Sequence, residues 1–150
     1  MGKDEAQYII KEIKSKKMYQ RKREDYHNDF LVLREKLYKL YGPRCPQSAN
    51  GERVAQTKTK EQIFLEILSD KDYAEKMFLH YDERLQIIQK LEAIVFYDDD
   101  GFARDFFKCS DSNSDMNYRK LERKYNVSNA YSTMLGRICK NAKSFSKLKQ

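Results

Sequence analysis

Residues 118–145 of this 150-residue chain read YRKLERKYNVSNAYSTMLGRICKNAKSF, and this stretch predicts a helix-turn-helix. A first helix is expected over residues 117–125, where apolar side chains at spacings of three and four would face inward. Asn126 is expected at the turn with a positive φ, which asparagine tolerates better than most residues do. Ser128 is the predicted N-cap of a second helix over residues 129–143, because its hydroxyl can accept a hydrogen bond from an unpaired backbone N–H.

The second helix has one apolar stripe and one polar face. The stripe follows spacings of four, three and four, and it consists of Tyr131, Leu135, Ile138 and Ala142, with Met134 and Phe145 on its flank. The opposite face would carry Asn129, Thr133, Gly136, Arg137 and Lys140. Amide, hydroxyl and cationic groups of this kind bind base edges and phosphates, and a glycine lets a partner approach the backbone closely.

Positive charge is concentrated in the same region. The chain has 30 Lys or Arg and 23 Asp or Glu, for a net charge of +7. Residues 1–101 contain 19 of each sign, so the whole excess lies in residues 102–150. From residue 118 onward, nine basic residues accompany a single acid, Glu122. A solvated face usually mixes both signs, so this bias favours nucleic-acid binding over a helical hairpin whose outer face is merely solvated.

One long helix is expected over residues 4–41. Its clearest part repeats apolar side chains at spacings of four and three, as in the a/d seam of a coiled coil. The residues of this seam are Tyr26, Phe30, Leu33, Leu37 and Leu40. Upstream the pattern weakens, because Ile10, Ile13 and Met18 shift the apolar face.

Residues 42–59 are expected to be a linker, since they contain both prolines and few apolar groups. Thr59 and Gln62 have the spacing of a capping box. A second long helix is expected over residues 60–95, with a break or kink at residues 69–72. Neither long helix can bury its apolar stripe alone, so an antiparallel hairpin is predicted, although the same seam could instead pair two copies of the chain.

A short helix over residues 102–107 would cover the helix-turn-helix with its aromatic side chains, because two helices cannot enclose a core.

The chain has few glycines and no strand-like alternation. The predicted fold class is therefore all-α. A long antiparallel helical hairpin arm is expected at residues 1–97, and a compact basic helix-turn-helix domain at residues 98–150.

The polar loop before the helix-turn-helix contains part of a calcium-binding pattern. Position 6 of an EF-hand loop should be Gly and is Met116 here, so capping of the next helix by Asp115 or Asn117 is favoured over calcium binding. The run Asp98-Asp99-Asp100 is interpreted as a solvated helix end. The residues at EF-hand positions 1, 3, 5 and 12 are Asp111, Asn113, Asp115 and Glu122.

No pattern in the chain predicts catalysis. It lacks a Gly-rich phosphate loop, a nucleophile elbow and a zinc-binding H-E-x-x-H helix. The three cysteines are far apart and fit reduced thiols better than a disulfide framework or a zinc site. We therefore expect no enzymatic activity, no metal and no cofactor.

The order of elements resembles the small phage and prophage transcription regulators of the ArpU and RinA type, whose C-terminal part is similar to region 4 of bacterial sigma factors. The resemblance covers most of the chain in layout. It departs from the family at Asn126, where glycine is usual, in a longer and more acidic loop before the helix-turn-helix, and at Gly136 inside the recognition helix. The matching residues are Tyr118-x-x-Leu121-Glu122-x-x-Tyr125-Asn126-Val127-Ser128, where the family has a helix such as E-x-I-A-x-x-L-G-x-S.

This resemblance implies a non-enzymatic, sequence-specific DNA-binding transcription regulator whose second helix enters the major groove. Base edges are the expected targets of Asn129, Thr133 and Arg137. Gly136 lies on the same face. Phosphates are the expected targets of Arg119, Lys120, Lys140, Lys143 and the region of Ser128.

The expected partner is double-stranded DNA, in the cytoplasm of a bacterial host cell and associated with its nucleoid. No secretion signal and no membrane-spanning run is evident in the sequence. The arm would set a homo-oligomeric state or bind a protein such as RNA polymerase. The alternative function is that of a small terminase-like DNA-packaging subunit or a helical adaptor that binds DNA nonspecifically.

Overall fold

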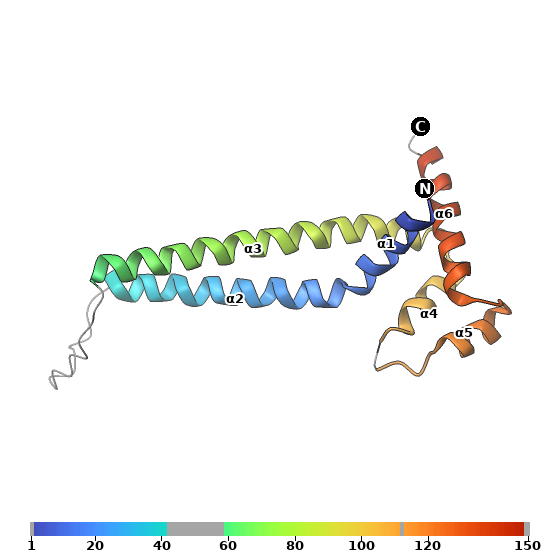
Figure 1. Cartoon of the computed structure of the whole chain (residues 1–150), viewed down its shortest axis with the longest axis horizontal. Helices are drawn as coiled ribbons and strands as arrows, with labels where there is room; N and C mark the ends of the chain where they lie inside the picture. The colour runs from blue at the N-terminus through green and yellow to red at the C-terminus, as the bar shows by residue number, and fades with distance from the viewer. Residues whose placement is uncertain (1, 42–58, 112, 149–150) are drawn as a thin grey trace. The chain divides into compact units, whose positions relative to one another are not determined.

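The computed structural model describes residues 2–41, 59–111 and 113–148, and this part of the chain is helical and contains no strand (Figure 1). The predicted all-α class is confirmed. The chain divides into two compact units, a head unit made of residues 1–17 and 85–150 and a hairpin unit made of residues 18–84. The helices are α1 (Lys3–Lys14), α2 (Lys16–Tyr41), α3 (Lys60–Val95), α4 (Phe102–Lys108), α5 (Tyr118–Tyr125) and α6 (Ala130–Leu148).

The hairpin unit is formed by α2 and α3, which lie side by side in Figure 1. The ring centroids of Tyr19 and Tyr81 are 5.8 Å apart, and those of Tyr26 and Tyr73 are 6.1 Å apart. Residue numbers rise along α2 as they fall along α3, so the two helices are antiparallel. The predicted hairpin therefore forms within one chain.

The predicted capping box is present at the start of α3. The backbone N–H of Gln62 donates to Thr59 Oγ1 at 3.2 Å, and the backbone N–H of Thr59 donates to Gln62 Oε1 at 3.0 Å. A break at residues 69–72 is absent, because α3 is one continuous helix from Lys60 to Val95. The linker expected over residues 42–59 lies outside the described residues except for Thr59.

The core of the head unit is built mainly from the three C-terminal helices. Phe102 and Phe106 of α4 are fully buried, as are Leu121 of α5 and Met134 and Ile138 of α6. This confirms that the short aromatic helix covers the helix-turn-helix. The apolar face of α6 is also close to the predicted stripe, with Met134 nearer its centre than expected.

Helix α1 belongs to this core rather than to the arm. It packs against α6 through a face on which Ala6, Ile9 and Ile10 are almost completely buried. The prediction of one helix over residues 4–41 was wrong, because the helix is divided at Ser15, whose hydroxyl donates to the carbonyl oxygen of Lys11 at 2.9 Å. The physical reason is the shift of the apolar face at Ile10, Ile13 and Met18. Because of this shift, α1 packs toward α6.

The compact units also differ from the predicted division at residues 97 and 98. Their boundaries fall within helices, between residues 17 and 18 in α2 and between residues 84 and 85 in α3. Ile88 and Val95, in the last turns of α3, are buried in the head unit. The head unit therefore combines three segments that are separate in the sequence, namely the start of the chain, the end of the predicted arm and the helix-turn-helix.

We expect Ile10→Ala to lower the free energy of unfolding by about 2–5 kcal/mol, because it removes a large apolar side chain from a closed core. Ile10 is 2% exposed, whereas Leu148, in the last turn of α6, is 66% exposed and provides the control Leu148→Ala. Chemical denaturation followed by circular dichroism measures both. Similar small losses for the two variants would show that α1 is not part of the core.

Candidate nucleic-acid interface

The turn between α5 and α6 has the predicted geometry. Asn117 is the N-cap of α5, and its Oδ1 accepts a hydrogen bond from the backbone N–H of Lys120 at 2.9 Å. Asn126 ends the helix in the left-handed region, with φ 53° and ψ 51°. The backbone N–H of Val127 then donates to the carbonyl oxygen of Glu122 at 3.0 Å. The positive φ expected at Asn126 is confirmed.

The N-cap of α6 is Asn129, so the prediction of Ser128 in this role was wrong. Asn129 Oδ1 accepts from the backbone N–H of Ser132 at 3.0 Å. Glu122, the single acid after residue 118, closes the same end, since its Oε1 accepts from the backbone N–H of Ala130 at 3.2 Å. Adjacent serine and asparagine residues are both good caps, and the register of α6 on the core selects the second.

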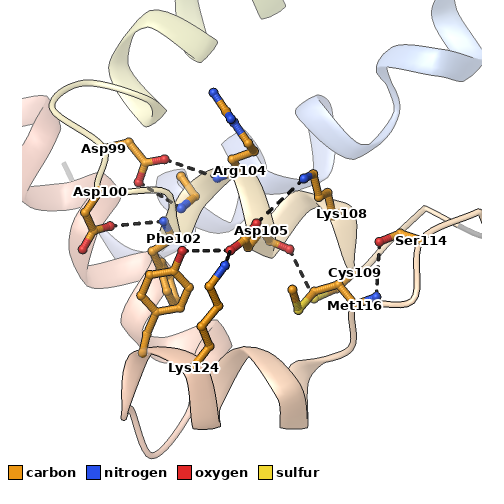
Figure 2. Close-up of polar contacts among 12 residues, drawn as sticks. Asp99, Asp100, Phe102, Arg104, Asp105, Lys108, Cys109, Ser114, Met116 and Lys124 are labelled. Carbon is orange, nitrogen blue, oxygen red and sulfur yellow. Dashed lines mark hydrogen bonds and ion pairs between the residues drawn. The ribbon is translucent and has the colours of Figure 1, made fainter.

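A buried carboxylate joins α4 to α5. Asp105 is 6% exposed, and its Oδ2 accepts hydrogen bonds from Lys124 Nζ and from the Tyr125 hydroxyl, both at 2.8 Å. Figure 2 shows Asp105 on α4 facing Lys124. The hydrogen bonds from Lys124 and Tyr125 hold the pKa of the Asp105 carboxyl below its ordinary value, and the same contacts raise the pKa of Lys124 and of Tyr125. No pattern in the sequence predicted this cluster.

The acidic run before α4 is used as a helix cap. Asp99 Oδ1 accepts from the backbone N–H of Ala103 at 3.0 Å, and Asp100 Oδ1 accepts from that of Phe102 at 3.1 Å (Figure 2). Between them and the helix, Gly101 has φ 103°, and a Cβ at this position would lie 3.0 Å from the hydroxyl of Tyr125. Glycine is therefore favoured here by its conformation, and a Cβ would also crowd the hydroxyl of Tyr125.

Arg137, an expected base-contacting residue, is engaged within the head unit. Its NH1 donates to Asp100 Oδ1 at 2.8 Å and its NH2 to Asp100 Oδ2 at 3.3 Å. The guanidinium carbon lies 4.5 Å from the centroid of the Phe102 ring. The Arg137 guanidinium is also the main cause that lowers the pKa of the Asp100 carboxyl. A contact between Arg137 and a base would require the guanidinium to leave Asp100.

The outer face of α6 carries most of the other expected contact residues. Gly136, Lys140 and Lys143 are exposed, and a Cβ on Gly136 would meet no atom within 4 Å. Lys147 extends the same face by one turn and was not predicted. We call these four residues the basic face of α6. Residues 130–148 contain no acid, so nothing on this helix offsets its charge.

The first turn of α6 adds polar groups that are partly occupied. Ser128 and Asn129 are exposed, but the amide oxygen of Asn129 caps the helix. Thr133 is half-buried, and its hydroxyl donates to the carbonyl oxygen of Asn129 at 2.7 Å. Thr133 can therefore accept a hydrogen bond from a partner without rearrangement, whereas donation would break the existing bond.

Helix α5 presents a second group of cations. Arg119 and Lys120 are exposed as expected, and Lys120 Nζ donates to the carbonyl oxygen of Asp115 at 3.1 Å. Arg123 is also exposed and was not predicted. Its neighbour Lys124 is different, because its charge is offset by Asp105.

The loop with the calcium-binding pattern is organised by local hydrogen bonds. Asp111 Oδ1 accepts from the backbone N–H of Asn113 at 3.1 Å, and Asp111 Oδ2 lies 3.2 Å from Lys17 Nζ. Both contacts lower the pKa of Asp111. Glu122 is directed to Ala130, as described above. Among the described residues, no group of three or more His, Cys, Asp or Glu is arranged to hold a metal ion.

No known protein family, curated protein or solved structure matches this chain. None of the helices in the described ranges combines the length and the apolar character that crossing a lipid bilayer requires. The chemistry of the head unit is therefore the main guide to function.

We expect Asp105→Asn to lower the free energy of unfolding at pH 7 by about 1–3 kcal/mol, since it removes the charge that accepts hydrogen bonds from Lys124 and Tyr125. The folded pKa of Asp105 lies below its unfolded value of about 3.9, so its stabilisation is complete above that pH range and is lost as the pH falls through the folded pKa. Denaturation at several pH values should show the two proteins converging below about pH 4. Asp115→Asn, at an exposed site, is the control, and a difference that persists in acid would contradict the assignment.

We expect Arg137→Ala and Asp100→Ala to be coupled in a double-mutant cycle by at most about 1 kcal/mol, because the pair is partly exposed and screened by solvent. The double variant should thus be more stable than the sum of the two single losses predicts. A second cycle with Lys140→Ala and Asp100→Ala should be additive. Additivity in both cycles would show that the Arg137–Asp100 pair does not stabilise the head unit.

Proposed function

We propose that this chain is a sequence-specific, non-enzymatic DNA-binding transcription regulator of phage or mobile-element type. The observation that carries the proposal is the basic face of α6, an exposed and acid-free surface on the second helix of a helix-turn-helix. The resemblance to regulators of the ArpU and RinA type supports the same conclusion. The protein would act in the cytoplasm of a bacterial host cell, at its nucleoid.

In this proposal α6 enters the major groove. Its first turns, with Asn129 and Thr133, would approach base edges, and the open backbone at Gly136 would allow close contact with the duplex. Lys140, Lys143 and Lys147 would bind phosphates farther along the helix.

Helix α5 would contact the backbone through Arg119 and Lys120. Arg137 would reach a base only by exchanging the Asp100 carboxylate for the acceptor groups of a base, so its contribution to specificity includes the cost of breaking that pair. The hairpin unit would provide the contact with RNA polymerase or with another copy of the chain.

A second candidate is a terminase-like packaging subunit or an assembly protein with nonspecific DNA binding. The observation that favours it is the open hairpin unit, in which apolar side chains such as Val32 and Tyr38 remain exposed. The number of copies per particle separates the two functions, because a packaging subunit forms a ring of many copies and a regulator is a monomer or dimer. Light scattering of the purified protein measures this number.

We expect the triple variant Lys140→Ala/Lys143→Ala/Lys147→Ala to bind random duplex DNA more weakly and with a smaller salt dependence. The slope of log affinity against log salt should fall by about 1 for each lost phosphate contact. Binding measured by fluorescence anisotropy at two or more salt concentrations tests this. Selection of genomic fragments by the unmodified protein then tests for a specific site.

The matched control is Arg21→Ala/Lys76→Ala/Lys90→Ala, which removes the same charge from exposed positions on α2 and α3. Equal losses in the two triple variants would mean that net charge, rather than the face of α6, governs binding. If the unmodified protein fails to bind DNA at low salt, the proposed function is wrong, and the basic face would instead suit an acidic protein partner.

A further inference from the structure

The hairpin unit leaves one of its broad faces open. Of its described residues, only Ala74 is buried, at 3% exposure, since two helices can enclose a single seam and no more. A groove of about 290 Å³ lies over Ala74 between α2 and α3. Val32 on the α2 side and Tyr73 on the α3 side line this groove and are 50% and 56% exposed. Exposed apolar surface of this kind on an otherwise polar hairpin is typical of a surface that binds a partner.

The α2 side of the groove carries charges in a defined order. Asp25 and Asp29 precede Val32 by seven and three residues, and Lys36 and Lys39 follow it by four and seven. This heptad spacing places all five residues on one stripe of the helix, the Val32 stripe. The four charged residues of the stripe are exposed, and Asp29 and Lys36 line the groove directly.

The helix dipole accounts for only one of these four charges, that of Lys39 in the last turn of α2. A dipole also favours acids in the first turn of a helix, whereas α2 begins with Lys16 and Lys17 and has no acid there. One local ion pair, between Lys39 and Glu35 at 3.4 Å, is exposed and adds little. Neither the dipole nor this ion pair accounts for the charges of Asp25, Asp29 and Lys36.

We propose that two copies of this chain associate through the Val32 stripe, in antiparallel orientation, about a two-fold axis that passes close to Val32. Such an axis places residues that precede Val32 in one copy against residues that follow it in the other. Asp29 then faces Lys36, and Asp25 faces Lys39, each twice. A parallel arrangement would place like charges opposite one another.

The association also covers the apolar groove. The Val32 side chains of the two copies meet at the axis, above the groove that contains Ala74 in each hairpin. Two hairpins stacked in this way make a four-helix bundle, which encloses a core that neither hairpin encloses alone. The inference concerns the hairpin unit and does not depend on DNA binding by the head unit.

Two charge variants test the proposal. Asp25→Lys/Asp29→Lys makes all four charges of the stripe basic, and Lys36→Glu/Lys39→Glu makes all four acidic. Each variant alone should dimerise on the order of a hundredfold more weakly than the unmodified chain, because four attractive pairs become repulsive. An equimolar mixture should regain a dimer, since every pair between unlike copies is again attractive. Analytical ultracentrifugation over a range of concentrations measures the mass of each sample.

The control variant is Asp72→Lys/Glu83→Lys, which makes the same change in charge at exposed positions on α3. It should dimerise like the unmodified chain, and circular dichroism should show that all variants remain helical. A monomeric unmodified chain at its highest soluble concentration would overturn the proposal. So would a ring of many copies, a dimer unaffected by either charge variant, or a mixture that stays monomeric.

Discussion

A carboxylate that is shielded from water needs partners, and in the head unit this requirement fixes how α4 meets α5. Asp105 sits on the inner side of a helix of seven residues, too short to be stable alone. Its two strong partners, Lys124 and Tyr125, come from the last turn of α5, immediately before the residue that ends that helix. The carboxylate thereby positions the end of α5, and with it the turn from which α6 starts.

The sequence predicted most reliably the features that depend on neighbouring residues. The left-handed conformation of Asn126 and the reciprocal caps of Thr59 and Gln62 are local consequences of side-chain chemistry, and both are present. The choice between Ser128 and Asn129 as cap was harder, because the two are chemically similar and the packing of α6 decides between them. The expectation of DNA contacts by the residues of α6 stays a prediction.

What the sequence did not predict are particular contacts between distant residues of the head unit. The packing of α1 on α6 joins parts of the chain more than a hundred residues apart, and the only advance sign was the change of apolar face at Ile10 and Ile13. In the sequence, Arg137 and Lys124 look like ordinary members of a basic segment. In the structure, each forms an ion pair with a carboxylate that precedes α5 in the chain. Counting charge along a sequence does not distinguish such internal cations from those that face a partner.

The discontinuous head unit has a consequence for how the protein is made. Helix α1 leaves the ribosome before α6, the helix against which it packs, has been synthesised. The apolar side chains of Ile9 and Ile10 therefore have no surface of α6 to bind until more than a hundred further residues have been translated. The hairpin unit can form in the meantime, because both of its helical segments have been synthesised by residue 84. The hairpin unit can thus form before the head unit, whose completion requires α6.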